Sequence, residues 1–350
     1  MSKLALEKIR VPPILYIGKG KISEVNRALS ELHYSSPLVV CGTHTWTICG
    51  QAVSKQLNSP GTCRVFDSTL EEVEKIVQSI KKHKVDVLCA VGGGKIIDTC
   101  KYAAYLESVD VISIPTTPSH DGICSPIAVI KLHNNNVSRS LKAKMPSGVI
   151  CDIDILKSAP LTSIRSGIGD LISNLSAVQD WQLAHEDGFE TDYNGFAALL
   201  ARNPAKNFFE LMKGKNILDQ ELLESLIEGL VLSGIAMEIA GSSRPCSGAE
   251  HLFSHALNEL YGGIASHGEQ VAMGTILVTY LRNQNWRDYA DFFSSFGMPV
   301  DCKSLGASEE QVINALVYGP KSRPGKYTIL DKVKIDSALA EKLVRIIKVA

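Results

Sequence analysis

Two histidines in the second half of the chain are spaced so that they could hold a metal ion. His251 and His255 are four residues apart, so they would share one face of a helix. Their neighbours Leu252, Phe253, Ala256 and Leu257 are apolar, which predicts that this helix is largely buried. One buried histidine can be satisfied by a backbone carbonyl, whereas two on one buried face favour a metal or another polar ligand.

An aspartate and a third histidine could join this pair. Asp170 follows Gly167 and Gly169 at an expected helix start, where an aspartate is also a common N-cap. His267 follows a short loop after the helix that carries His251. It could fold back toward that histidine or be a solvated residue at the next helix start. Two histidines and one carboxylate with an open fourth position are typical of catalytic zinc, and iron(II) accepts the same ligands.

A glycine-rich turn in the first half of the chain could bind a dinucleotide. A buried strand over residues 85–91 runs into Gly92–Gly94, a helix follows, and a second strand at 109–114 ends in the hydroxyl-rich stretch 115–119. This βαβ pattern places the turn and the later loop at the same edge of a parallel sheet, where helix N–H groups can meet a pyrophosphate. The glycines could also serve only the tight turn, but Asp98 and the second loop favour nucleotide binding.

The remaining patterns divide the chain into an α/β part and a helical part. Strands and helices alternate up to about residue 154, which predicts a mostly parallel, Rossmann-like sheet covered by helices. From residue 167 onward the pattern predicts helices and no strand. We therefore expect a dinucleotide-binding α/β domain at 1–158 and an all-helical metal and substrate domain at 159–350.

The boundaries that we expect follow from periodicity and from helix stops. Strands are predicted at 12–17, 37–41, 63–66, 85–91, 109–114, 127–132 and 148–153, with a hairpin-like turn at 133–138. Helices are predicted at 21–32, 46–57, 167–186, 195–213, 218–241, 249–260, 268–283, 285–296, 308–318 and 337–348, and a capping box at 68–71 opens one more.

Composition limits the classes of function. The chain has 350 residues, 45% of them hydrophobic and 21% charged, and its net charge of −1 argues against a nucleic-acid surface. Its nine cysteines include no C-x-x-C pair, which indicates reduced thiols in a cytoplasmic protein. No stretch has the pattern of a signal peptide or of a membrane helix, so we expect no membrane insertion.

Taken together, these motifs are similar to those of a known enzyme superfamily. The chain resembles the iron-dependent alcohol dehydrogenases, glycerol dehydrogenases and dehydroquinate synthases, and within them the archaeal sn-glycerol-1-phosphate dehydrogenases. The matching residues are Gly92–Asp98, Pro115–Gly122 with Ser125, Gly169–Asp170, Gly248–His255 and Ser266–Gly268. The resemblance implies a dehydroquinate synthase-like fold, a homo-oligomer and an oxidoreductase of lipid biosynthesis. The implied reaction is the NAD(P)H-dependent reduction of dihydroxyacetone phosphate to sn-glycerol 1-phosphate.

The resemblance also implies roles for individual residues. Asp170, His251 and His267 would hold one zinc ion per subunit, with iron as the other possibility, and Asp121, Asp170 and His255 would face the substrate. Asp121 and His255 would act in catalysis, and we expect His255 to position substrate or relay a proton. The cofactor, NAD or NADP, would contact Gly94, Lys95, Ile96, Ile97, Asp98, Thr116, Thr117, Pro118, Ser119 and Ser125.

Cofactor preference and substrate leave alternatives open. No acidic residue follows the strand at 37–41, where NAD-selective enzymes hold the ribose hydroxyls, so we expect NADPH to be accepted as well as NADH. Glycerol or another small alcohol is the alternative substrate, and a synthase-type lyase or a non-catalytic binding module fits the motifs less well. Candidates for holding a substrate phosphate are Lys142, Lys144, Arg165, Lys321 and Arg323.

Overall fold

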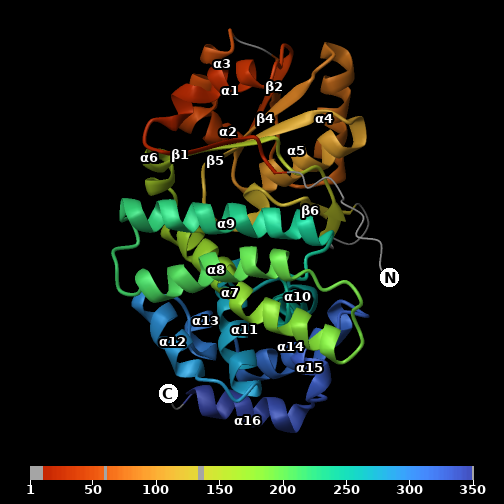
Figure 1. Cartoon of the computed structure of the whole chain (residues 1–350), viewed down its shortest axis with the longest axis vertical. Coiled ribbons are helices and arrows are strands. Elements are labelled where there is room, and N and C mark those ends of the chain that lie inside the picture. Colours follow the sequence, from red (N-terminus) through yellow and green to blue (C-terminus); the bar gives the residue numbers. More distant parts are fainter. Residues whose placement is uncertain (1–10, 59–60, 133–137, 349–350) are drawn as a thin grey trace.

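The computed structural model describes residues 11–58, 61–132 and 138–348. A six-stranded sheet lies at one end of the molecule and a large group of helices at the other (Figure 1). All strand pairs of this sheet are parallel, in the order β1-β8-β5-β4-β2-β3. The strands are β1 (Ile14–Gly18), β2 (Pro37–Cys41), β3 (Thr62–Arg64), β4 (Val87–Gly92), β5 (Asp110–Pro115) and β8 (Gly148–Asp152). The predicted parallel sheet is therefore confirmed.

Helices cover both faces of the sheet because the strands are apolar on both sides. Alternate residues of β2 and β4 point to opposite faces. Val39 and Cys89 pack with α1 (Val25–Glu31) and α3 (Gln51–Gln56). Leu38, Val40, Leu88 and Ala90 pack in the other cluster, with α4 (Leu70–His83) and α5 (Gly94–Glu107). Strands buried on both faces explain the continuous apolar runs in the sequence.

Several features of the α/β part differ from the sequence-based prediction. A second, two-stranded antiparallel sheet pairs β6 (Ile127–Lys131) with β7 (Ser138–Lys142). The pattern missed β7 because its residues, SRSLK, are polar and mostly exposed. The expected turn at 133–138 falls almost entirely outside the described residues. The capping box at 68–71 is wrong, since Thr69 is the N-cap of α4 and its side chain accepts from the Glu72 N–H.

The region predicted at 46–57 is helical but interrupted. It consists of a π-helical turn, η2 (Trp46–Gly50), between α2 (Thr43–Thr45) and α3. Two 3-10 turns are also present, η1 (Lys21–Glu24) before this region and η3 (Asp121–Ile123) after it, and α6 (Ile153–Lys157) follows β8 directly. Periodicity reports an apolar face and does not distinguish these tighter and wider turns from a regular α-helix.

The rest of the described chain is helical, as predicted. The longer helices are α7 (Leu161–Glu186), α8 (Gly195–Leu211), α9 (Gln220–Ala240), α10 (Ala249–Tyr261), α11 (His267–Leu281), α12 (Trp286–Ser295), α14 (Glu309–Ser322) and α16 (Ser337–Lys348). The short helices α13 (Cys302–Leu305) and α15 (Ile329–Lys332) were not predicted, because one turn shows no periodicity. In Figure 1, α9 runs along the boundary beneath the sheet and α16 lies at the far end. No helix in the described part of the chain is both long and apolar enough to cross a bilayer.

The start of α7 corrects one expectation directly. This helix begins at Leu161, so Asp170 lies well inside it and is neither the first residue nor the N-cap. Gly167 and Gly169 are therefore interior helix positions. Glycine in a helix interior is destabilising relative to alanine, so a packing reason must maintain these two residues.

Candidate active site

Two glycines allow α7 and α11 to touch at the level of their backbones. A Cβ atom on Gly169 would overlap the carbonyl oxygen of Gly268, and one on Gly268 would overlap the carbonyl oxygen of Ser166. The Ser166 hydroxyl also accepts a hydrogen bond from the Gly268 N–H at 3.0 Å. Since Asp170 and His267 each adjoin one of these glycines, the close approach brings their side chains together.

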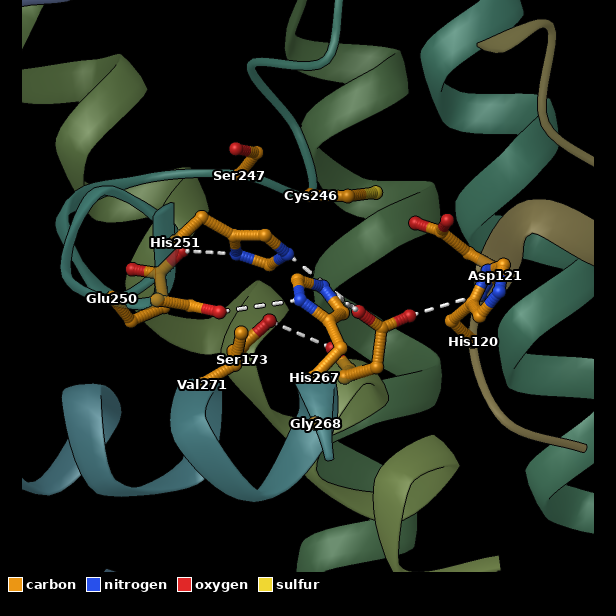
Figure 2. Close-up of polar contacts among 12 residues, drawn as sticks. His120, Asp121, Ser173, Cys246, Ser247, Glu250, His251, His267, Gly268 and Val271 are labelled. Carbon is orange, nitrogen blue, oxygen red and sulfur yellow. Dashed lines mark hydrogen bonds and ion pairs between the residues drawn. The ribbon is translucent and has the colours of Figure 1, made fainter. Parts of the chain in front are cut away.

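Asp170, His251 and His267 converge on one point. Oδ1 of Asp170 lies 3.6 Å from Nε2 of His251 and 3.5 Å from Nε2 of His267. One ligand atom from each residue lies within 4.8 Å of the other two. Figure 2 shows the two imidazoles coming from different helices, α10 and α11, toward the same space. Two imidazole nitrogens and a carboxylate oxygen form a donor set that fits zinc or iron(II) and leaves coordination positions for other ligands.

A second layer of side chains orients both imidazoles. Oε1 of Glu250 lies 3.0 Å from Nδ1 of His251, and Oγ of Ser254 lies 3.3 Å from Nδ1 of His267. The Ser254 hydroxyl donates to Oε1 of Gln270 at 3.0 Å, so its oxygen can accept a hydrogen bond from Nδ1–H of His267. These partners favour a proton on Nδ1 of each ring, which would leave Nε2 of each ring available to bind a metal ion. This arrangement is the usual support for metal-ligating histidines.

The charges of this cluster are balanced in a way that suits a cation. Burial alone would raise the pKa of the Asp170 carboxyl, but hydrogen bonds from His251 and His267 hold it well below its usual range. Burial would lower the pKa of His251, yet Asp170 and Glu250 raise it to about 9. In the absence of a metal, a proton on His251 therefore partly compensates two buried carboxylates. A divalent cation would replace that proton, as metal binding to histidine generally does.

Asp121 and His255 lie beside the cluster. The backbone N–H of Asp121 donates to Oδ2 of Asp170 at 2.9 Å, which ties the loop after β5 to the cluster of candidate metal ligands. Burial and the neighbouring Asp170 charge raise the pKa of the Asp121 carboxyl well above its usual range. The ring of His255 lies 6.4 Å from that of His251, and burial together with the Arg323 charge lowers its pKa, so it is a neutral imidazole.

The glycine turn and the hydroxyl-rich loop meet at the carboxyl edge of the sheet. Gly93 is the N-cap of α5, and the N–H of Thr116 donates to the Gly92 carbonyl at 3.1 Å. On its other side this loop packs on α7, where a Cβ atom on Gly167 would overlap the carbonyl oxygen of Pro118. The first turn of α5, the 116–119 loop and the Asp170 helix thus form one continuous wall, which explains the second interior glycine of α7.

Some residues expected at the dinucleotide have side chains that face the interior. Ile97 is fully buried, and Asp98 forms an ion pair with Lys101 at 2.8 Å and accepts from the Val129 N–H at 2.9 Å. The Ser125 hydroxyl is also buried and is directed at the Ile127 carbonyl. The Lys95 ammonium forms an ion pair with Asp67 at 2.9 Å. Around α5, the groups best placed to meet a ligand are therefore the backbone N–H groups of its first turn.

The five basic residues considered for a phosphate do not form a cluster. Lys142 and Lys321 are exposed. Lys144 forms an ion pair with Asp110 at 2.7 Å, and Arg323 forms one with Glu259 at 2.9 Å. Arg165 donates to the Phe296 carbonyl.

Sequence reasoning also gave no role to Glu250 or Ser254. The available signal was that each lies beside or one turn from a candidate ligand in a helix that is otherwise apolar.

Known proteins with similar sequences are enzymes. The family model described as iron-containing alcohol dehydrogenase matches residues 16–160. Glycerol-1-phosphate dehydrogenase [NAD(P)+] of Hyperthermus butylicus is 39% identical over 349 residues, covering 97% of this chain and 98% of the relative. The protein of the same name from Pyrococcus horikoshii is 41% identical over 339 residues, covering 96% and 97% of the two chains.

Solved structures of more distant proteins share the fold. A probable glycerol dehydrogenase from Sinorhizobium meliloti superposes with a TM-score of 0.77 at 23% identity, with 98% of each chain covered. Glycerol dehydrogenase from Schizosaccharomyces pombe gives a TM-score of 0.78 at 21% identity, covering 97% of this chain and 90% of the yeast protein. At these identities the likeness establishes the α/β and all-helical architecture alone.

Proposed function

Because the chain belongs to the glycerol-1-phosphate dehydrogenase family, within the iron-containing alcohol dehydrogenases, we propose that it reduces dihydroxyacetone phosphate to sn-glycerol 1-phosphate with NADH or NADPH. One hydride and one proton are added across the carbonyl, and NAD(P)+ is released. The observation that carries the proposal is the convergence of Asp170, His251 and His267 beside the edge of a parallel sheet. Full-length relatives that carry this activity in their names support the choice of substrate.

Asp170, His251 and His267 would hold the metal, zinc or iron(II), which supplies Lewis acidity toward a carbonyl oxygen when bound. The protein's own contribution is to fix the three ligand atoms before substrate arrives. Glu250 and Ser254 hold the two imidazoles with Nε2 facing inward. The Asp121 N–H holds the second oxygen of Asp170. Such pre-organisation lowers the reorganisation needed at the reacting centre.

The alkoxide product needs a proton, and His255 is placed to deliver one. It is one helical turn from the ligand His251 and its low pKa keeps it neutral. A neutral imidazole can give the proton on one ring nitrogen and accept another on the second nitrogen, so it can serve as a relay. The Asp121 carboxyl, on the other side of the cluster, would hold the substrate hydroxyl group in position.

The dinucleotide would bind across the carboxyl edge of the sheet. The N–H groups of Gly94 and Lys95, at the start of α5, would hold the pyrophosphate, and residues 116–119 would line the other side. This binding mode uses the backbone of the glycine turn and the loop that packs on α7. It would bring the nicotinamide end toward Asp121, because that residue continues the same loop.

The proposal is tested by an assay with defined metal content. Purified protein reconstituted with zinc or iron(II) is mixed with dihydroxyacetone phosphate and NADH or NADPH, and the absorbance of the reduced cofactor is followed. Chiral analysis of the product must show the 1-phosphate enantiomer. Efficient oxidation of glycerol without turnover of dihydroxyacetone phosphate would instead establish the alternative, a glycerol or small-alcohol dehydrogenase.

We further propose that the enzyme works in the cytoplasm as a homo-oligomer. Eight of the nine cysteines are free, buried thiols, which fits a reducing compartment. Helix α8 exposes the apolar side chains of Phe196, Leu199 and Leu211, which a second subunit could cover. Light scattering coupled to gel filtration measures the assembly directly, and a monomer at assay concentration would contradict it.

A further inference from the structure

Lys326 is a positive charge for which the described part of the chain provides no carboxylate within ion-pair distance. Its Nζ donates to Oγ of Ser247 at 2.7 Å and to Oγ of Ser243 at 3.3 Å. The side chain remains partly accessible although protein surrounds it. Burial and the nearby Arg244 charge lower its pKa to about 8. An enclosed ammonium that meets only hydroxyl groups is incompletely compensated, and such charges usually have a partner.

The other cations of this neighbourhood already have partners. Arg244 forms an ion pair with Glu190 at 3.0 Å and donates to the Tyr327 carbonyl at 2.8 Å. Arg323 forms an ion pair with Glu259 at 2.9 Å. Lys326 is therefore the basic group of this neighbourhood that is best able to accept an incoming anion.

One buried carboxylate fixes Lys326 next to the metal-ligand helix. Asp180 accepts from the Ala249 N–H at the start of α10 and from the Ile329 N–H at the start of α15, both at 2.7 Å. Ser247 and Lys326 lie just ahead of these two helix starts. The same helix α10 carries His251, and Figure 2 shows Ser247 and Cys246 beside the His251 ring. Lys326 also contributes to the low pKa of His255, so its charge is felt at the active site.

The substrate has the dimensions that this placement requires. In dihydroxyacetone phosphate only one methylene and one ester oxygen separate the carbonyl carbon from phosphorus, so the phosphate must bind next to the metal ligands. Resting on the function proposed above, we infer that the Lys326 ammonium, together with the hydroxyls of Ser243 and Ser247, binds the substrate phosphate. Each hydroxyl accepts from Lys326 and keeps its own proton to donate to a phosphate oxygen.

The experiment compares a phosphorylated with an unphosphorylated substrate. In Lys326→Met, kcat/KM for dihydroxyacetone phosphate is expected to fall about 30-fold or more, as for loss of a charged hydrogen bond. The value for dihydroxyacetone itself is expected to stay within about threefold, which is below the cost of a typical hydrogen bond. Ser243→Ala/Ser247→Ala should give a smaller loss of the same kind. Lys321→Met, which removes an exposed lysine five residues earlier, is the matched control and should change neither value.

A second readout does not depend on turnover. Titration calorimetry with inorganic phosphate should detect binding to the wild-type protein and to Lys321→Met but not to Lys326→Met, at equal metal content and equal circular dichroism. Undiminished phosphate binding by Lys326→Met, or an equal loss of activity on both substrates, would overturn the inference while leaving the proposed function standing. If the wild type uses dihydroxyacetone but not its phosphate, the proposed function fails instead, and the inference fails with it.

Discussion

Oε1 of Glu250 lies 3.0 Å from Nδ1 of His251, on the nitrogen opposite the one that faces Asp170. The carboxylate is fully buried and also accepts from the Gly248 N–H and the Ser176 hydroxyl. It is therefore rigid, and it determines both the orientation of the imidazole and the nitrogen that carries the proton. The neighbouring residue in the sequence acts as a support for the ligand, although it does not face the ion position.

Replacing this carboxylate should weaken metal binding without removing a ligand. In Glu250→Gln the amide can donate to Nδ1 and so favour the wrong tautomer, and the negative charge behind the ring is lost. We expect metal affinity to fall about 10- to 100-fold, the usual cost of losing such a partner. Competition with a chelator of known affinity measures it. Glu259→Gln, on the outer part of the same helix, is the control, and unchanged affinity in Glu250→Gln would contradict the supporting role.

The close contact between α7 and α11 makes Gly169 sensitive to a single methyl group. In Gly169→Ala the new Cβ would meet the Gly268 carbonyl, so the helices must separate and Asp170 must move away from His267. We expect a loss of about 1–3 kcal/mol in the free energy of unfolding, as for overpacking, together with weaker metal binding. Denaturant titration and metal competition provide the two measurements.

A matched glycine shows whether the effect is local. Gly195 opens α8, has an ordinary backbone conformation and would place a Cβ in open space. Gly195→Ala should keep both stability and metal affinity near the wild-type values. If Gly169→Ala behaved in the same way, the backbone contact would not be what positions the two ligands.

The sequence predicted the sheet and identified Asp170, His251 and His267 as candidate metal ligands, but it did not predict why these residues meet. Apolar runs and helical periodicity are local signals, and they located β4, β5 and the helix with His251 and His255. The same reasoning treated Gly167 and Gly169 as a helix start, because glycine before an aspartate is a local stop-and-cap signal. Their true role is contact with Pro118 and Gly268, which lie far away in the chain.

Charge partners were predicted least well. Asp98 was expected to contact the dinucleotide, and nothing in the sequence indicated that its carboxylate also pairs with Lys101 and accepts from the Val129 N–H. Conversely, Lys326 was not considered for a phosphate, since nothing in KSRPGKY distinguishes it from Lys321. Whether a lysine is solvated, paired or enclosed with hydroxyls depends on tertiary packing, which no local pattern encodes.

His255 provides a test that separates a ligand from a catalytic group. Its ring lies 6.4 Å from that of His251 and it does not belong to the convergent ligand atoms. In His255→Ala we expect turnover to fall about 100-fold or more, in the range for loss of a general acid–base group, while metal content stays at the wild-type value. Steady-state kinetics and metal analysis of the same sample measure both. A parallel loss of metal would make His255 a ligand instead.

Arg64 is expected to favour NADPH over NADH. It ends β3 beside the carboxyl end of β2, where dinucleotide folds hold the adenine ribose, and it donates to the Gly42 carbonyl at 3.2 Å. Its guanidinium lies 4.0 Å from the centre of the Trp46 ring, which fixes its direction. In Arg64→Ala, kcat/KM for NADPH should fall about tenfold relative to NADH, equal to about 1.4 kcal/mol.

The control for this change is another arginine stacked on a tryptophan. Arg287 lies 4.6 Å from the Trp286 ring but belongs to α12, far from β2 in the fold (Figure 1). Arg287→Ala should leave the ratio of NADPH to NADH efficiency unchanged. Equal losses for both cofactors in Arg64→Ala would indicate a role in adenine binding or in folding, and would exclude selection of the 2′-phosphate.

The pH dependence of phosphate recognition follows from the charge state of Lys326. Burial and Arg244 lower its pKa to about 8, with Arg323 acting in the same direction and Glu250 and Asp180 against it. The ammonium binds phosphate and the neutral amine does not, so the ratio of kcat/KM for dihydroxyacetone phosphate to that for dihydroxyacetone should fall above pH 8. Well above this pKa the charged fraction falls about tenfold per pH unit. Below about pH 6 the ratio should fall again as the substrate phosphate takes up a proton.

Taking the ratio of the two substrates cancels the titration of groups that affect both of them, such as His255 and the candidate metal ligands. In Lys326→Met the alkaline fall should disappear, and its persistence there would assign the titration to another group.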